Sequence, residues 1–200
     1  MVGVGKTTLA RHIAERLGFR LSLEKVDNNP FLEDYYRDFS RWSFHLQIYF
    51  LAERFKEHRR IQETHVGYVQ DRTIYEDVEI FARLQYERGA MSTREYATYV
   101  GLFEAMTTFP YFKPPHLVIC LRGNFEQILQ RIHRRGRPME LAAPIDYWRS
   151  LYERYERWID AFDKAKAIVV DIDAYDVYAP EGTEDLLQRI RQALAAQGTA

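Results

Sequence analysis

The chain has 200 residues, with 28 basic and 29 acidic side chains and a formal net charge of −1. This length suits one domain with a sizeable core, and the charge balance excludes the strongly basic proteins that coat nucleic acid. A single cysteine, Cys120, excludes an internal disulfide and a cysteine zinc cage, and no apolar run reaches the roughly 20 residues of a membrane span.

Short apolar runs alternate with long amphipathic stretches, which predicts an α/β fold with a mainly parallel sheet flanked by helices. No repeat, linker or low-complexity tract divides residues 1–200, so we expect one domain. The last two predicted strands are continuous apolar runs, which is typical of strands covered on both faces. The predicted strands are 21–25, 66–71, 117–121 and 167–172, and the predicted helices are 7–17, 42–59, 75–87, 92–108, 125–134, 145–164 and 183–195.

The first residues carry the strongest functional signal. The segment Gly3-Val4-Gly5-Lys6-Thr7-Thr8 matches the second half of a phosphate-binding loop, G-x-x-x-x-G-K-[ST]. In such a loop, backbone N–H groups and the start of the following helix bind phosphate oxygens. The lysine reaches the transferred phosphate, and the threonine hydroxyl can bind Mg²⁺. The segment therefore predicts an ATP site.

The strand that normally precedes this loop, and the first glycine of the motif, would lie before Met1. Burial of such a strand's apolar side chains contributes roughly 1.5–3 kcal/mol for each. Its loss would be comparable to the whole stability of a domain, about 5–15 kcal/mol. We therefore expect that this chain is a truncated form of a longer protein. The alternative is that the match is a coincidence and Met1 is the true start.

Two predicted strands end in side chains that could act on a hydroxyl acceptor. Glu24 lies near the end of the first strand, and ligands of doubly wound sheets gather at the carboxyl ends of strands. A carboxylate there can accept a proton, although a solvent-facing acid is the alternative. Asp71 and Arg72 end the second strand, where they could hold Mg²⁺ and an oxygen at the reaction centre. The alternative for this pair is an ordinary salt bridge.

Arginines gather in the segment 131–140, at the end of one predicted helix and just beyond it. A phosphoryl-transfer site needs planar donors for the phosphoryl oxygens, and arginine supplies them. Together with the phosphate-binding loop, the segment predicts a lid that closes over ATP. A basic surface helix and a nucleic-acid patch are the alternatives.

The order of these motifs resembles that of the deoxynucleoside kinase family over nearly the whole chain. The loop alone indicates only nucleotide binding, whereas RWSFxxQ followed by DR[ST]xxxD and RxxxRGR is far more specific. The resemblance implies a P-loop kinase fold, ATP and Mg²⁺, and a homodimer formed through a helical face. The matching segments are GVGKTT, LEKVDNNPFL, RWSFHLQ, DRTIYED, RIHRRGRPME and PIDYW.

The resemblance also implies the residues that perform the reaction. Glu24 matches the general base that deprotonates the 5′-hydroxyl of the nucleoside. Arg72 matches the arginine that holds the 5′-oxygen and this base. Asp71 matches the acid that serves Mg²⁺ together with Thr7, and Lys6 stabilises the phosphoryl oxygens.

On the nucleoside side, Tyr36 and Glu140 match the pair that binds the sugar 3′-hydroxyl, and the tyrosine disfavours ribose. Gln47 matches the amide that binds the base edge, and a spacing of seven residues places Arg54 on the same helix face. Arg54 and Asp77 match the pair at the far end of the implied base pocket, and Phe81 matches the ring that stacks on the base.

On the ATP side, Arg131, Arg135 and Arg137 match the lid arginines, of which Arg135 and Arg137 would act in catalysis. The segment from Asp173 to Tyr178, which includes Tyr175, falls where the family has its loop around the ATP adenine. The implied ATP site otherwise consists of residues 3–8 of the loop.

These residues predict transfer of the ATP γ-phosphate to the 5′-hydroxyl of a deoxynucleoside in nucleotide salvage. The combination of Gln47, Arg54 and Asp77 is compatible with purines and with cytosine. We expect deoxyadenosine or deoxyguanosine as the substrate, because the NPFL stretch and the length resemble the bacterial purine members. No signal peptide is visible, so a cytoplasmic enzyme without nucleic-acid or membrane partners is expected. A nucleoside monophosphate kinase resembling thymidylate kinase is one alternative, which the acidic Glu24 disfavours. A nucleotide-binding protein without turnover is another.

Overall fold

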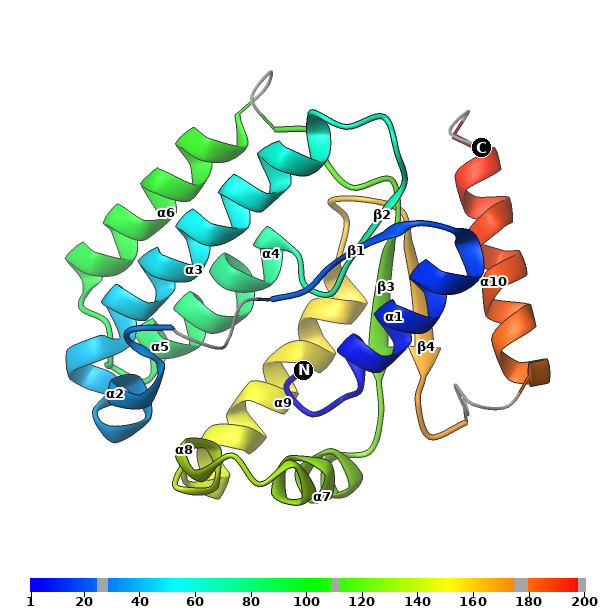
Figure 1. Ribbon diagram of the computed structural model, residues 1–200. Coiled ribbons are helices and arrows are strands. Elements are labelled where there is room, and N and C mark those ends of the chain that lie inside the picture. The colour runs from blue at the N-terminus through cyan, green and yellow to red at the C-terminus, as the bar shows by residue number, and fades with distance from the viewer. Residues whose placement is uncertain (25–28, 109–111, 175–179, 198–200) are drawn as a thin grey trace.

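The computed structural model describes residues 1–24, 29–108, 112–174 and 180–197 (Figure 1). Its strands form two parallel pairs. β1 (Arg20–Ser22) pairs with β2 (Tyr68–Gln70), and β3 (Val118–Arg122) pairs with β4 (Ala167–Asp171). All four predicted strands are therefore present among the described residues, each shorter or shifted by a few residues, and their parallel pairing confirms the expected fold class.

Helices lie on both sides of the strands (Figure 1). α1 (Lys6–Leu17) and α10 (Pro180–Ala195) lie on one side, while α3 (Phe39–Gln62) and α6 (Thr93–Thr107) form a layer on the other. None of the described helices combines the length and the apolar character needed to cross a bilayer. The remaining helices are α2 (Leu32–Arg37), α4 (Ile74–Glu76), the π-helical η1 (Asp77–Ala82), α5 (Arg83–Glu87), α7 (Phe125–Arg135), α8 (Pro138–Leu141) and α9 (Ile145–Ala161).

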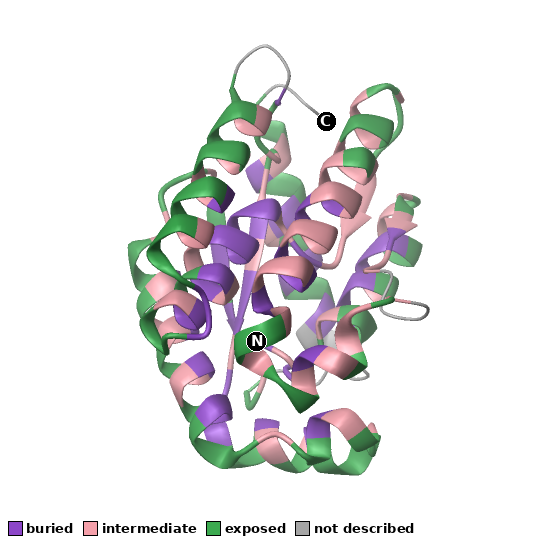
Figure 2. Cartoon of the chain, turned by 90° about the vertical axis from the view of Figure 1, so that its left-hand side faces the viewer, coloured by how far each residue is buried: buried purple, intermediate pink, exposed green. Residues whose placement is uncertain are grey.

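Buried residues lie along the faces where helices and strands meet (Figure 2). Among the described residues, the two larger of three hydrophobic clusters hold the layers together. The larger one joins α1 to α7 and α9, with Leu9, Ile132 and Leu151 fully or almost fully buried. Val4 of the first loop is anchored in it. The second cluster joins α3 to α6 and to the segment 74–82, around Leu51. The first loop and α3, which carry predicted site residues, thus pack into different hydrophobic clusters.

The prediction that both last strands are covered on both faces is wrong for β4. Its residues alternate between exposed and buried, and Val169 is 42% exposed. Its partner β3 is largely buried. β4 is hydrogen-bonded to β3 alone among the described strands. Because one face of β4 is open, its residues alternate between exposed and buried, although four of its five residues are apolar.

Several helix boundaries differ from the prediction. α3 begins at Phe39 rather than at residue 42, because the side chain of Asp38 accepts a hydrogen bond from the Arg41 N–H at 3.0 Å and caps the helix. The predicted helix 75–87 is three pieces with a π-helical centre. The short helices α2 and α8 were not predicted, because elements of four to six residues carry little periodic signal.

Candidate active site

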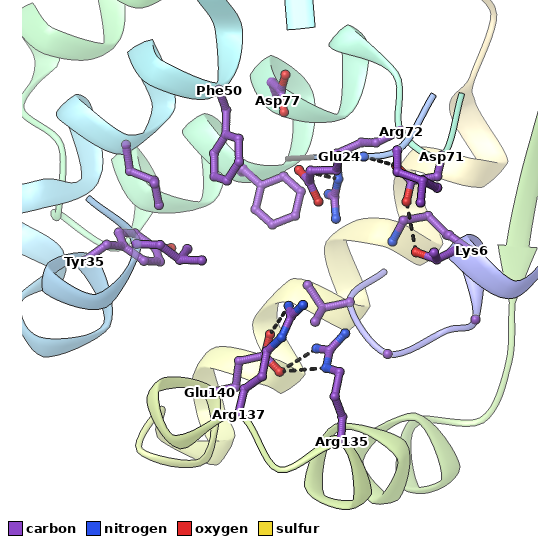
Figure 3. Close-up of a pocket in the computed structure, with 18 of the residues that line it drawn as sticks. Lys6, Glu24, Tyr35, Phe50, Asp71, Arg72, Asp77, Arg135, Arg137 and Glu140 are labelled. Atoms are coloured by element: carbon purple, nitrogen blue, oxygen red, sulfur yellow. Dashed lines mark hydrogen bonds and ion pairs between the residues drawn. The ribbon is translucent and has the colours of Figure 1, made fainter. Parts of the chain in front are cut away.

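A cavity of about 490 Å³ lies between the first loop, the ends of β1 and β2, α3 and the α7–α8 segment (Figure 3). It brings together nearly all the predicted site residues from six regions of the chain. Those that line it are Gly3, Gly5, Lys6, Thr7, Thr8, Glu24, Tyr36, Gln47, Arg54, Asp71, Arg72, Asp77, Phe81, Arg131, Arg135, Arg137 and Glu140.

The first loop has the backbone of an anion-binding turn. Gly3 and Gly5 have φ angles of +76° and +99°, a region that favours glycine. The Lys6 Nζ donates to the Met1 carbonyl at 2.7 Å across the loop. Burial, together with the nearby charge of Arg72, lowers the pKa of Lys6 to about 8. The loop thus presents a cation and the start of α1 to the cavity.

Oxygen ligands lie directly beside this loop. The Thr7 hydroxyl donates to Asp71 Oδ2 at 2.9 Å, and Asp71 Oδ1 accepts from the backbone N–H of Glu24 at 3.0 Å. A hydroxyl and a carboxylate so placed are the hard oxygen ligands that Mg²⁺ prefers, and Mg²⁺ needs only one or two protein ligands when it also binds phosphates. The residues therefore fit a magnesium site.

Glu24 lies between two buried arginines. Its Oε1 is 2.9 Å from Arg54 Nη2 and 3.2 Å from Arg72 Nε. Burial alone would raise the pKa of Glu24, but the charges of Arg72 and Arg54 outweigh it and lower this pKa to about 2. Glu24 is therefore ionised at neutral pH. Both of these arginine contacts are made by Oε1.

The far end of the cavity is lined by α3 and η1. Arg54 forms a bidentate ion pair with Asp77, in which its Nη2 lies 2.9 Å from Asp77 Oδ1. Gln47 lies two turns earlier on α3, on the same face, as predicted. It is only 2% exposed, and its Oε1 has no hydrogen-bond partner among the described residues. An unpaired amide facing a cavity indicates a polar ligand. The Phe81 ring lies 4.7 Å from the Arg72 guanidinium carbon.

The lid arginines are held by an acidic residue of the same cavity. Arg135 Nε lies 3.1 Å from Glu140 Oε2, and Arg137 Nη1 lies 3.4 Å from Glu140 Oε1 (Figure 3). Arg131 instead donates to the Val4 carbonyl at 3.4 Å, next to the first loop. The arginines that were predicted to bind phosphate thus lie between the loop and Glu140.

Some predicted residues are not brought into the cavity. The side chain of Val4 is 1% exposed in the core, which leaves only its backbone to contact a ligand. Asp173 does not line the cavity; its carboxylate accepts from the Asn124 N–H, and its own N–H donates to Asp171 at 2.9 Å. Tyr175 lies outside the described residues.

Three aromatic residues of the cavity were missed by the sequence analysis: Tyr35, Phe50 and Tyr147. The hydroxyls of Tyr35 and Tyr147 are 3.1 Å apart. Phe50 lies on α3 one turn after Gln47, so helical spacing could have identified it. The pairing of Tyr35 with Tyr147 joins α2 to α9, and no local pattern reveals it.

Comparison with known proteins gives matches to one family over almost the whole chain. A family model described as Deoxynucleoside kinase matches residues 1–195. The deoxyadenosine/deoxycytidine kinase of Bacillus subtilis (strain 168) is 50% identical over 194 residues, which cover 96% of this chain and 89% of that protein. A deoxyadenosine kinase of Lactobacillus acidophilus (strain ATCC 700396 / NCK56 / N2 / NCFM) is 32% identical over 206 aligned positions, with 98% and 94% coverage. The solved structure of deoxyadenosine kinase from M. mycoides with bound dATP matches with a TM-score of 0.81, at 29% identity, and covers 96% of this chain and 95% of that one.

Proposed function

Because this chain belongs to the deoxynucleoside kinase family, we propose that its cavity holds a deoxynucleoside between Glu24 and Gln47 and the ATP phosphates on residues 3–8. The chain has the P-loop kinase fold and is an ATP-dependent deoxynucleoside kinase. The observation that most strongly supports this proposal is that an ionised carboxylate, Glu24, lines the same cavity as the phosphate-binding loop.

In the proposed reaction, Glu24 accepts the proton of the 5′-hydroxyl as this oxygen attacks the γ-phosphate. Arg72 holds the 5′-oxygen, and Lys6 with Arg135 and Arg137 stabilises the phosphoryl oxygens. Phosphoryl transfer asks for little covalent chemistry from the protein, so that positioning and charge stabilisation supply most of the rate. A general base typically adds a factor of about 10²–10⁴.

Thr7 and Asp71 are proposed to hold Mg²⁺, on the ground of their oxygen atoms and their place beside the loop. When bound there, the ion neutralises charge on the ATP phosphates. Among the described residues no group of three or more histidine, cysteine or acidic side chains forms an all-protein metal cage.

Among the two purine deoxynucleosides, deoxyadenosine is the proposed preferred substrate, because the relatives of 50% and 32% identity are named for it. Adenine presents an amino donor beside a ring nitrogen acceptor, which fits the acceptor and donor atoms of the Gln47 amide. Cytosine presents the same pair, so deoxycytidine is the expected second substrate, in agreement with the name of the Bacillus subtilis relative. Tyr36 and Glu140 are proposed to bind the 3′-hydroxyl of the sugar.

The adenine contact, the oligomeric state and the location of the protein are also proposed. We infer that the segment from Asp173 to Tyr178, of which residues 175–178 lie outside the described residues, contacts the ATP adenine, because Asp173 follows β4 and its carboxylate accepts from the Asn124 N–H at the start of α7. We also infer a homodimer, in keeping with the family, which size-exclusion chromatography with light scattering can test. The cytoplasm supplies ATP and deoxynucleosides together and is the proposed location.

The test is a kinetic panel of the four common deoxynucleosides with Mg·ATP, in which the monophosphate products are measured by chromatography. We expect the highest kcat/KM for deoxyadenosine and a much lower value for adenosine. Deoxyadenosine monophosphate, offered as an acceptor in the same assay, should give no diphosphate. A preference for thymidine or for a monophosphate acceptor would contradict the proposal.

A further inference from the structure

We propose that Glu76 and Tyr155 are positioning residues that hold Arg72 in place while Glu24 takes up its proton. Neither residue lines the cavity, and neither has a part in the mechanism above. The inference rests on the proposed function, because it assumes that Arg72 holds the 5′-oxygen. The proposal explains how Arg72 is kept aligned with the reacting atoms.

The contacts form a short chain behind Arg72. Arg72 Nη1 donates to the Tyr155 hydroxyl at 3.0 Å, and this hydroxyl donates to Glu76 Oε1 at 2.9 Å. The same Glu76 oxygen lies 3.8 Å from Arg72 Nη1. Because a phenol has one proton, its donation to the carboxylate turns a lone pair toward the arginine, which fixes the direction of both bonds.

Glu76 itself is held firmly. Its second oxygen, Oε2, accepts from the Thr73 N–H at 2.8 Å in the capping box that begins α4. Glu76 and Arg72 are both nearly inaccessible to solvent. Both carboxylate oxygens therefore have defined partners, so the anion has little freedom to turn away from Arg72.

Arg72 is consequently restrained on three sides. Glu24 contacts its Nε, Tyr155 contacts its Nη1, and the Phe81 ring covers its face. Tyr155 also packs edge-on against Phe81, with ring centroids 6.0 Å apart. The contact of Nε with Glu24 is an ion pair at 3.2 Å without hydrogen-bond geometry, and together the three contacts restrict how the planar guanidinium can turn.

The arrangement has a consequence for the reaction. Before transfer, the charge of Arg72 is balanced by Glu24 and Glu76 together. When Glu24 takes the proton of the 5′-hydroxyl it becomes neutral, and Glu76 remains the adjacent counter-ion of the buried arginine. An unbalanced buried charge is costly, so Glu76 limits the tendency of Arg72 to move just as the phosphoryl group is transferred.

The test uses the full chain, with deoxyadenosine and Mg·ATP as substrates, in the variants Tyr155→Phe and Glu76→Gln. Tyr155→Phe removes one hydroxyl but keeps the ring against Phe81. Glu76→Gln removes the charge but keeps an oxygen for the capping hydrogen bond. The matched control is Tyr152→Phe, the same substitution one turn earlier on α9, where the ring packs against Phe125.

We expect each of the two variants to lower kcat by about tenfold or more, with both KM values within about twofold of wild type. Tyr152→Phe should retain the wild-type kcat. Arg72→Lys provides a double-mutant cycle. If Tyr155 acts through Arg72, then Tyr155→Phe should have little further effect in the Arg72→Lys background, whereas a purely structural effect would add to it.

The outcomes separate the inference from the proposed function. A wild-type protein that phosphorylates no deoxynucleoside would contradict the proposed function. An active wild type whose Arg72→Lys variant is impaired, but whose Tyr155→Phe and Glu76→Gln variants keep the wild-type kcat, would overturn only the positioning role. So would effects on KM alone, or additive effects in the cycle.

Discussion

Glu24 is the residue on which the proposed chemistry of the site depends most. Its backbone N–H binds Asp71, and its side chain contacts Arg54 and Arg72, so its position is fixed from both ends. The two arginines keep it ionised, and a carboxylate must be ionised to accept a proton. The same contacts place the acceptor oxygen within the cavity that the loop shares.

Glu24→Gln should lower kcat by a factor of about 10²–10⁴, because the amide keeps the shape of the side chain but cannot take the proton. The KM for deoxyadenosine should change little. Steady-state kinetics with varied deoxyadenosine measures both constants. Glu63→Gln, which changes an exposed acid at the end of α3, is the control and should match wild type. Equal kcat values in Glu24→Gln and wild type would remove Glu24 from the role of base.

The low pKa of Glu24 also predicts how stability depends on pH. The pKa is about 2 in the folded protein, below its usual value of 4.5. The unfolded chain thus binds more protons in this range, and the stabilising contribution of Glu24 is present above about pH 4.5 and is lost as the pH falls toward 2.

Between pH 6 and pH 3, wild type should therefore lose about 2 kcal/mol more free energy of unfolding than Glu24→Gln. Urea unfolding of both proteins across this range measures the difference. Parallel stability curves would show that the arginines do not hold the carboxylate in its ionised form.

Individual site residues were predictable where a motif names them. The pairing of Arg72 with Glu24, and of Arg54 with Asp77, follows motifs whose residue types serve the reaction directly. The contact of Tyr155 with Arg72 was not predictable, because it depends on where α9 crosses the segment 72–81. Gln47 and Arg54 were placed on one face by helical spacing alone, and the cavity confirms this.

At the scale of elements, the first loop packs closely against α7 at Gly3. A Cβ atom at Gly3 would lie 2.7 Å from Ile132 Cγ1 and 3.1 Å from the Ile128 carbonyl oxygen, both on α7. At Gly5, the nearest atom would be Arg131 Nη1, at 4.0 Å. Both glycines have positive φ, but only Gly3 lies directly against another helix.

Gly3→Ala should therefore destabilise the protein more than Gly5→Ala. Both substitutions incur the left-handed backbone cost of roughly 1–2 kcal/mol. Gly3→Ala adds the cost of overpacking against α7, about 1–3 kcal/mol. Denaturant unfolding of the two variants measures the difference. Equal destabilisation would contradict the close contact of the loop with α7.

The elements were predictable where periodicity or composition is strong. α1, α6 and α9 follow from amphipathic patterns and caps such as the Ser92 and Glu95 capping box, which the structure contains. The π-helical turn at Asp77–Ala82 gives no such signal, because its sequence continues the helical pattern on both sides. Its first residue, Asp77, pairs with Arg54 of α3.

At the scale of the whole molecule, Glu140 lies between the two proposed substrate sites. This residue pairs with the lid arginines Arg135 and Arg137, and it is also the proposed partner of the sugar 3′-hydroxyl. A nucleoside that engages Glu140 therefore competes with the arginines for the same carboxylate. Release of Arg135 would leave it to bind ATP phosphates.

Deoxyadenosine should accordingly tighten the binding of a non-hydrolysable ATP analogue by about fivefold or more. The compound 2′,3′-dideoxyadenosine, which has no 3′-hydroxyl, should give little or no such effect. Isothermal titration calorimetry with each nucleoside at saturation measures both. The same enhancement from the two nucleosides would show that Glu140 does not connect the sites.

The central claim is that one continuous cavity holds the ATP phosphates at the loop and the nucleoside at Glu24 and Gln47. The most direct measurement is inhibition by adenosine joined 5′ to 5′ to deoxyadenosine through a short polyphosphate chain. Such a compound should inhibit competitively against both ATP and deoxyadenosine, and more tightly than either nucleoside alone. Inhibition that is competitive against only one substrate would contradict the claim.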